Sequence, residues 1–146
     1  MPNGRVTSIS DEVRALLGRE NTLVLATTLD DGTPAATPLF YYFDGEAALY
    51  WLSSPESRHS RNLAARPRVA VAVYAAVRDW REIRGVQMEG VAEAVVDAAV
   101  LARYRERHGL GQELDAAIAR STMYVFRVAW WRYVDGLGEQ AAPHRL

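Results

Sequence analysis

A short run of polar residues carries the richest chemistry in this sequence. An apolar stretch ends at Ser53, and a segment typical of a helix then opens on Ser57, Arg58, His59 and Ser60. The first turn of a helix leaves backbone N–H groups without partners and carries a partial positive charge. Hydroxyls and a guanidinium beside such donors suit a phosphate group. The run therefore predicts an anchor for a phosphate monoester.

Composition limits the other chemistry that the chain can perform. It has 146 residues, a formal net charge of −1, no cysteine, and seventeen basic residues that are all arginine. Without cysteine or lysine, its side chains provide no thiolate, no Cys-based zinc site and no Schiff base with pyridoxal phosphate. The three histidines, His59, His108 and His144, lie far apart in the sequence, which argues against a histidine metal cluster. The near-neutral charge argues against bulk nucleic-acid binding.

Length and hydropathy predict one cytoplasmic domain spanning residues 1–146. No apolar run approaches the ~20 residues needed to cross a membrane. The first residues, Met-Pro-Asn-Gly-Arg, lack the apolar core of a signal peptide. We find no internal repeat, low-complexity segment or linker.

The elements that must position the polar run are mostly strands. Turn signals such as Asp30-Asp31-Gly32 and Asp44-Gly45 separate short β-forming runs, which predicts an antiparallel sheet. The predicted strands cover residues 22–29, 34–43, 47–53, 69–74, 83–96, 122–129 and 130–134, and the predicted helices cover 8–20, 56–65, 97–108 and 112–120. Six or more antiparallel strands in so short a chain predict a mainly β fold, a small β-barrel with flanking helices.

Two capping arrangements are open for the helix at 56–65. Ser54 fits as the N-cap with Pro55 at the first helical position. Ser53 with Glu56 fits a capping box that begins one residue earlier.

Other patterns have structural interpretations. The apolar run at 69–74 is typical of a strand buried on both faces, and the glycines within 83–96 indicate a bend or bulge. Gln87 and Glu89 alternate with apolar residues, as on the outer face of a strand. We interpret Trp130-Trp131 as core and interface packing, and Arg103, Arg105 and Arg107 as a solvated helix face.

Together, the ordered motifs resemble a known family over residues 8–136. The pieces, in chain order, are Leu25-Ala-Thr-Thr28, Gly32-x-Pro34, Thr37-Pro38-Leu39-Phe40, Leu49-Tyr-Trp-Leu-Ser53, Ser57-Arg-His-Ser-x-Asn62-Leu, Arg66-Pro-Arg-Val-Ala70, Ile83-Arg-Gly-Val-Gln-Met-Glu-Gly90 and Trp131-Arg-Tyr-Val-Asp135. This set is similar to the pyridoxamine 5′-phosphate oxidase-like proteins, which are split β-barrels that bind flavin mononucleotide (FMN).

The resemblance implies a homodimer with two FMN sites at its subunit interface. In such proteins, the segment matching Ser57, Arg58 and His59 holds the flavin phosphate, with Ser60 beside it. The residues matching Thr37, Pro38, Leu39 and Phe40 run beside the isoalloxazine ring, and those matching Leu52 and Ser53 lie along the ribityl chain. Partner-subunit residues cover the ring's other side, near the positions of Trp80, Arg84 and Gln87.

Departures from the family pattern argue against pyridoxamine phosphate oxidation itself. Histidine stands at position 59, where the vitamin B6 oxidases usually carry lysine, and their arginine-containing C-terminal segment has no counterpart here. We therefore expect an FMN-dependent oxidoreductase with an unknown small-molecule substrate. A nicotinamide could donate electrons, although the chain has no Gly-x-Gly-x-x-Gly fingerprint.

Two alternatives stay open. A deazaflavin-dependent reductase would need a basic groove for an acidic tail, for which Arg66, Arg68 and Arg78 are candidates. A non-enzymatic flavin- or haem-binding protein is the other; in the haem case His59, His108 or His144 would ligate iron.

Overall fold

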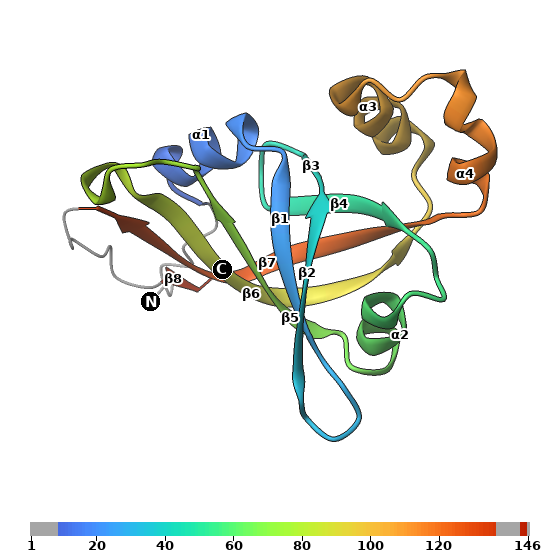
Figure 1. Cartoon of the computed structure of the whole chain (residues 1–146), viewed down its shortest axis with the longest axis horizontal. Coiled ribbons are helices and arrows are strands. Elements are labelled where there is room, and N and C mark those ends of the chain that lie inside the picture. The colour runs from blue at the N-terminus through green and yellow to red at the C-terminus, as the bar shows by residue number, and fades with distance from the viewer. Residues whose placement is uncertain (1–8, 137–143, 146) are drawn as a thin grey trace, which may run out of the picture.

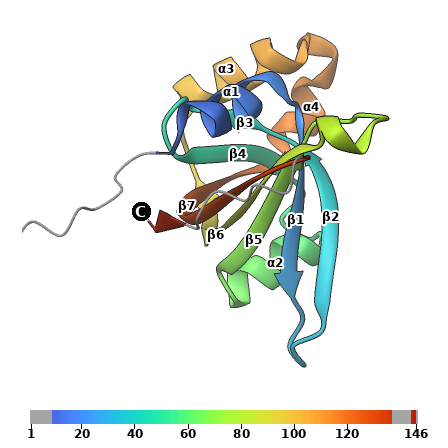
Figure 2. The ribbon, with the colours of Figure 1, turned by 90° about the vertical axis from the view of Figure 1, so that its left-hand side faces the viewer.

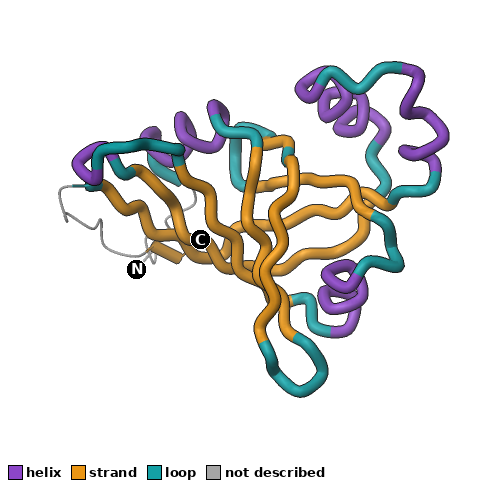
Figure 3. Tube along the Cα trace, viewed as in Figure 1, coloured by secondary structure: helices purple, strands orange, loops and turns teal. Residues whose placement is uncertain are grey.

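The computed structural model describes residues 9–136 and the two-residue strand at 144–145. In chain order, its elements are α1 (Asp11–Arg19), β1 (Thr22–Thr28), β2 (Pro34–Phe40), β3 (Tyr42–Phe43), β4 (Ala48–Ser53), α2 (Arg58–Ala65), β5 (Arg68–Tyr74), the 3₁₀ helix η1 (Trp80–Glu82), β6 (Arg84–Val95), α3 (Ala98–His108), the 3₁₀ helix η2 (Gln112–Leu114), α4 (Asp115–Ala119), β7 (Thr122–Asp135) and β8 (His144–Arg145). Figure 3 shows how strands dominate this trace. The predicted mainly β class is confirmed.

All strand pairs are antiparallel and belong to one sheet, in the order β2-β1-β5-β6-β7-β4-β3, with β8 on β7. The sheet curls into a half-barrel (Figure 1). Its first and last strands, β2 and β3, are joined in the chain by the single residue Tyr41. The two ends of the sheet are therefore brought together by covalent continuity, although no ladder pairs them.

Tyr41 explains why the strand predicted at 34–43 is two strands. Its backbone N–H donates to Asn21 O (3.0 Å), and its buried hydroxyl donates to Leu17 O (2.7 Å) at the end of α1. Because Tyr41 bonds to α1 and its following loop, the ladder breaks there and the chain turns from β2 into β3. The sequence pattern of apolar residues gives no sign of this break.

The core lies inside the curled sheet and is closed at one end by α1. The helix is capped by Ser10, whose hydroxyl accepts from Val13 N (3.3 Å), and it buries Val13, Leu16 and Leu17 as the spacing predicts. Figure 2 shows α1 and α3 near one end of the sheet and α2 near the other. The largest fully buried side chains are Trp51, Tyr41, Phe126, Leu16, Leu17, Leu23, Leu25, Leu49, Leu63 and Met88, along with two valines.

Two strand predictions differ in detail from the structure, and a third is confirmed. β5 is buried on one face only, because Ala70 and Ala72 are half-buried between fully buried valines. Residues 122–134 form one continuous strand, β7, rather than two. The bulge expected in β6 is present between Glu89 and Gly90, where an added Cβ would lie 2.0 Å from the Arg127 carbonyl oxygen. Glycine at position 90 thus lets β6 and β7 stay paired.

Candidate functional site

The polar run begins α2, but neither predicted capping register is correct. Ser57 is the N-cap: its backbone is extended, and its hydroxyl accepts from Ser60 N (3.3 Å). Ser54 instead starts a tight turn, in which its carbonyl oxygen accepts from Ser57 N (3.1 Å). The turn uses Pro55 and Glu56 before the helix opens, so α2 starts at Arg58. Both proposed registers placed the helix start too early.

His59 joins this helix start to the end of β4. Its Nε2 atom lies 2.6 Å from Ser53 Oγ and 3.2 Å from Ser57 Oγ. The Ser57 hydroxyl also lies 2.7 Å from Ser60 Oγ. Burial lowers the pKa of His59, which favours the neutral ring in the free protein. Ser53, Ser57, His59 and Ser60, four predicted site residues, therefore form one hydrogen-bonded cluster, which we call the serine–histidine cluster.

The backbone at the start of α2 adds donors to this cluster. In an eight-residue helix whose cap bonds Ser60 N, the N–H groups of Arg58 and His59 have no carbonyl to bond within the helix. These two donors carry the positive end of the helix dipole. Hydroxyls, a ring nitrogen and two N–H groups at one place match the acceptor oxygens of a phosphate monoester.

Arg58 lies on an adjacent face of α2. It lines a surface hollow of about 440 Å³ next to the β1–β2 turn, together with Arg61 and Arg66. Arg66 donates from Nε to Thr28 O (2.7 Å) and from a terminal nitrogen to Asp30 Oδ1 (2.8 Å). Within residues 9–136 no hydrogen bond or ion pair of Arg58 or Arg61 is recorded. The Arg58 guanidinium is exposed and unrestrained beside the cluster.

The strand predicted to flank the flavin ring is β2, an edge of the sheet. Pro38 pairs with Val24 of β1 and is exposed, which agrees with the tolerance of edge strands for a residue without an N–H. Thr37 and Leu39 are half-buried, and Phe40 is 60% exposed. Both β1 and α2 contact β2, so the helix that opens with the polar run lies beside the strand that carries the predicted ring segment.

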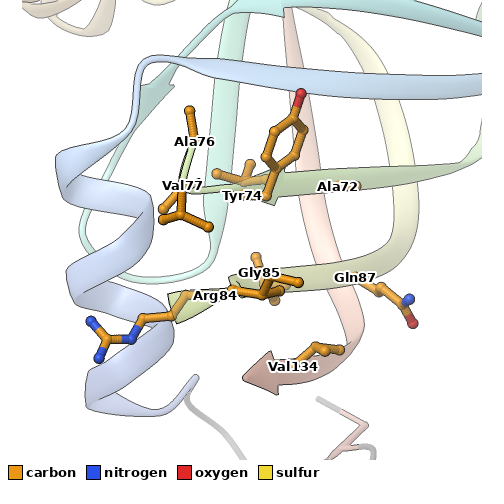
Figure 4. A pocket seen from close by; sticks show the side chains of 12 residues that line it. Ala72, Tyr74, Ala76, Val77, Arg84, Gly85, Gln87 and Val134 are labelled. Carbon is orange, nitrogen blue, oxygen red and sulfur yellow. The ribbon is translucent and has the colours of Figure 1, made fainter. Parts of the chain in front are cut away.

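The remaining predicted residues form a separate group at the β5–β6 connection. Arg84 and Gln87 line a largely apolar hollow of about 530 Å³, and exposed Trp80 lies in η1 between the two strands. Gln87 is on the outer face of β6, as expected, and Figure 4 shows it extending away from Arg84. Residues three apart on a strand point to opposite faces, so these two side chains do not converge.

Within one chain, two strands lie between β2 and the strand that carries Gln87. Pro38, Val24, Ala72 and Gln87 are successive cross-strand partners on β2, β1, β5 and β6. Three inter-strand steps of about 4.8 Å put Gln87 roughly 14 Å from Pro38. A single flavin ring on β2 would not reach Gln87 of the same chain.

The arginines of α3 lie at the surface as their spacing predicts, with Arg103 and Arg107 exposed and Arg105 half-buried, but two of them also bond to other segments. Arg107 donates to Gly18 O (2.8 Å), Arg19 O (3.3 Å) and Glu20 O (3.4 Å) at the end of α1. Arg105 donates to Gly111 O (3.0 Å) and Asp115 Oδ1 (2.6 Å). Helical spacing shows which side chains share a face, but it carries no information on carbonyl groups contributed by a distant helix end.

Sequence reasoning also missed Tyr104 and His108 as neighbours of the site. Both project from α3 toward the end of β2, and their rings lie 4.7 Å apart between centroids. His108 Nε2 is 2.8 Å from Tyr41 O, and burial lowers the pKa of its ring. The signal in the sequence was an aromatic pair at i and i+4 on one helix face.

Residues 9–136 hold neither a metal-binding cluster nor a membrane-spanning helix. No group of three His, Asp or Glu residues there could hold a metal ion. No helix among them has both the length and the apolar character to cross a membrane. Trp131 packs in the core, as expected, and the His144 side chain lies outside the described residues.

Comparison with known proteins decides the family. A family model described as pyridoxamine 5′-phosphate oxidase matches residues 9–135. The chain belongs to this family. A pyridoxine/pyridoxamine 5′-phosphate oxidase of Burkholderia lata is 34% identical over 107 residues, covering 73% of this chain and 47% of the relative. The chain thus spans about half the length of the curated relatives it matches.

Solved structures of similar fold are named for different groups. A haem binding protein from Mycobacterium smegmatis has a TM-score of 0.76 and 26% identity, covering 92% of this chain and 57% of that one. An F420 reductase has a TM-score of 0.67 and 24% identity, covering 90% and 98%. An FAD-binding protein from Mesorhizobium loti has a TM-score of 0.64 and 24% identity, covering 85% and 91%. The last two establish likeness of fold alone.

Proposed function

We propose that this chain binds FMN and acts as a flavin-dependent oxidoreductase on a small molecule. The observation that carries the proposal is the serine–histidine cluster at the start of α2, in a member of the pyridoxamine 5′-phosphate oxidase family. The residues fit the group: hydroxyls, two N–H donors and the exposed Arg58 suit a dianionic phosphate. β2, on which Pro38 is exposed, contacts α2 and offers a strand against which a flat ring would lie.

The chain's own residues would hold and orient the cofactor. Ser57 and the N–H groups of Arg58 and His59 would bind the phosphate, and buried Ser60 would hold the Ser57 hydroxyl from behind. Ser53 and Leu52 would follow the ribityl chain, and β2 would support the ring. Bound FMN would supply hydride or electron transfer, which depends on positioning more than on proton relays. A nicotinamide remains a candidate electron donor within this proposal.

A homodimer is part of the proposal. The outer face of β2, β1 and β5 presents small apolar side chains, and the row Ala36, Ala26, Ala70 is followed by Glu89 on β6. Such a face, hollowed at Ala26, Ala70 and Glu89, can pack against a second copy and bury apolar surface. Because Gln87 lies roughly 14 Å from Pro38 of its own chain, a partner's Trp80 or Gln87 is better placed to cover the ring. Light scattering should give twice the chain mass of 16.3 kDa.

Oxidation of pyridoxamine phosphate itself is not part of the proposal. The chain aligns with about half of the curated oxidases, so their complete activity does not carry over. His59 also stands where those enzymes usually carry lysine.

The structure gives the two alternatives weaker support. Arg66, Arg68 and Arg78, the candidates for an acidic deazaflavin tail, do not share a hollow: Arg66 lies beside Arg58, Arg68 lines a hollow at β5, and Arg78 lies between β5 and η1. For haem, His108 Nε2 is engaged with Tyr41 O. His59 Nε2 lies within hydrogen-bond distance of two hydroxyls.

Reconstitution tests the proposal. FMN added to the purified protein should bind, with quenching of its fluorescence. Arg58→Ala should weaken binding at least about tenfold, the low end for a hydrogen bond to a charged group. Arg120→Ala, which alters an exposed arginine at the end of α4, is the matched control. A Soret band in the purified protein, a single deazaflavin band, or no FMN binding would contradict the proposal.

A further inference from the structure

The barrel has a seam where two strand edges face each other without a ladder. β4 pairs with β3 only at Tyr50 and Leu49, so its edge at Leu52 has no strand partner on that side among the described strands. β2 pairs with β1 along its length, and its other edge, including Phe40, is likewise without a strand partner. β2 and β4 nevertheless contact each other. These two edges, at Phe40 and Leu52, form the seam.

Tyr104 of α3 fills this seam. Its side chain is buried, at 5% exposure, and its hydroxyl donates to Phe40 O (3.4 Å) on β2. The backbone of Leu52 on β4 also acts on this hydroxyl, since it lowers the pKa of the Tyr104 phenol. Burial raises the pKa of the phenol, and the Leu52 contact opposes that rise, so the hydroxyl stays protonated at neutral pH. One neutral hydroxyl can both donate and accept, and this one links the two edges.

His108, one helical turn later, supports Tyr104 from the side. Its ring lies between those of Tyr104 (4.7 Å between centroids) and Phe40 (5.1 Å). Its Nε2 atom is bonded to the carbonyl oxygen of Tyr41, the residue that joins β2 to β3. Tyr104 is thus held between a strand end and the tilted ring of His108, which limits its rotamer freedom.

α3 itself is fastened at both ends. Asp97 caps its start by accepting from Val100 N (3.0 Å), and Gly109, with φ of 63°, ends it in the left-handed conformation. Arg107 ties its last turn to the final carbonyls of α1. Such a rigid support fixes where the Tyr104 hydroxyl lies relative to β2 and β4.

We propose that Tyr104 is a positioning residue for the cofactor site, because it fixes the separation of the two strands that flank the proposed flavin. β2 carries Thr37 to Phe40, the proposed ring segment, and β4 carries Leu52 and Ser53, the proposed ribityl segment. This inference rests on the proposed function. Tyr104 touches neither ring nor phosphate in this account; it acts through the backbone of Phe40 and Leu52.

Tyr104→Phe tests the inference, because it removes the hydroxyl and keeps the ring contacts. We expect FMN affinity to fall about three- to tenfold, as for the loss of one hydrogen bond of ordinary strength. Because the seam widens, the visible bands of bound FMN should also shift. Tyr42→Phe is the matched control, because it removes the same hydroxyl from a tyrosine on β3 whose ring packs against Tyr50. The Tyr42 hydroxyl bonds Arg103 and not the seam, so this variant should bind FMN like wild type.

The outcomes separate the two proposals. FMN affinity and spectrum that are unchanged in Tyr104→Phe, with wild type binding normally, would overturn the positioning role alone. A wild-type protein that binds no FMN would overturn the proposed function and the positioning role together. An equal loss in Tyr42→Phe would also overturn the specific role of Tyr104. Thermal unfolding of each variant without FMN distinguishes a local effect from general loss of the fold.

Discussion

The helices α2 and α3 use the same residue type in opposite ways. In α2, Arg58 and Arg61 are exposed, and within residues 9–136 no bonded partner of either is recorded. In α3, Arg105 and Arg107 are each bonded to backbone carbonyls of other segments. The first pair is available to a ligand, and the second pair holds the structure together. An arginine count or a helical spacing does not distinguish these roles; the partner brought by the fold does.

The difference also shows how each helix is attached. α2 buries Leu63 in the core. It also buries Asn62, whose side-chain amide donates to Thr27 Oγ1 (3.1 Å). α3 buries only Tyr104 and relies on polar contacts at its ends. We therefore expect α2 to depend on its core contact and α3 on its hydrogen bonds.

The largest expected effect comes from the core contact of α2. Leu63 is 1% exposed within the main core cluster. Leu63→Ala should lower the free energy of unfolding by about 3 kcal/mol, the usual range for a buried leucine. Denaturant unfolding measures this loss. Leu101→Ala, at a half-buried position on α3, is the control and should lose clearly less. Equal losses would mean that the two helices are attached in the same way.

A smaller effect is expected for the arginine that fastens α3. Arg107→Ala removes the donors to the α1 carbonyls and should lower the free energy of unfolding by about 1 kcal/mol. FMN affinity should fall less than in Tyr104→Phe, because Arg107 acts on the proposed site only through α3 and the variant keeps the Tyr104 hydroxyl. Arg61→Ala is the matched control: stability should stay within about 0.5 kcal/mol of wild type. If Arg61→Ala were the more destabilising of the two, the contrast between the helices would fail.

The smallest effect concerns His59 and pH. Burial lowers its pKa in the folded protein below the ordinary value near 6.5. The unfolded chain therefore takes up the proton more readily, so the stabilising contribution of neutral His59 is present above pH 6.5 and is lost as the pH falls below it. The free energy of unfolding of His59→Gln should decline less than that of wild type between pH 7.5 and 5.5. Parallel pH profiles would show that His59 is solvated as in the unfolded chain.

Local patterns carried most of the fold prediction. The period of buried residues in α1, the glycine turns at 32 and 45, and the alternation in β6 each depend on neighbours in sequence, and each was predicted. The break at Tyr41 depends on Leu17 O and Asn21 O, which belong to α1 and the loop after it. No local pattern encodes such a contact, so the sequence predicted one strand where the structure has two.

In the candidate site, too, local features were predicted and long-range contacts were missed. The serine–histidine cluster lies within eight consecutive residues, so the sequence pattern was enough to predict that its members form one site. The capping register failed because two serines and a proline satisfy the same local rule at adjacent positions, and only the Ser54–Ser57 turn decides between them. Tyr104 was missed because its partners, Phe40 and Leu52, are more than fifty residues away in the chain.

Tyr41 has a consequence for how the protein behaves at high concentration. Bare strand edges recruit strands from other molecules and so seed aggregation. Here the two terminal strands of the sheet follow one another in the chain, and Tyr104 and His108 cover the place where they meet. Intermolecular strand addition at this point would first require α3 to detach. The covered connection between β2 and β3 therefore opposes aggregation through these strand edges.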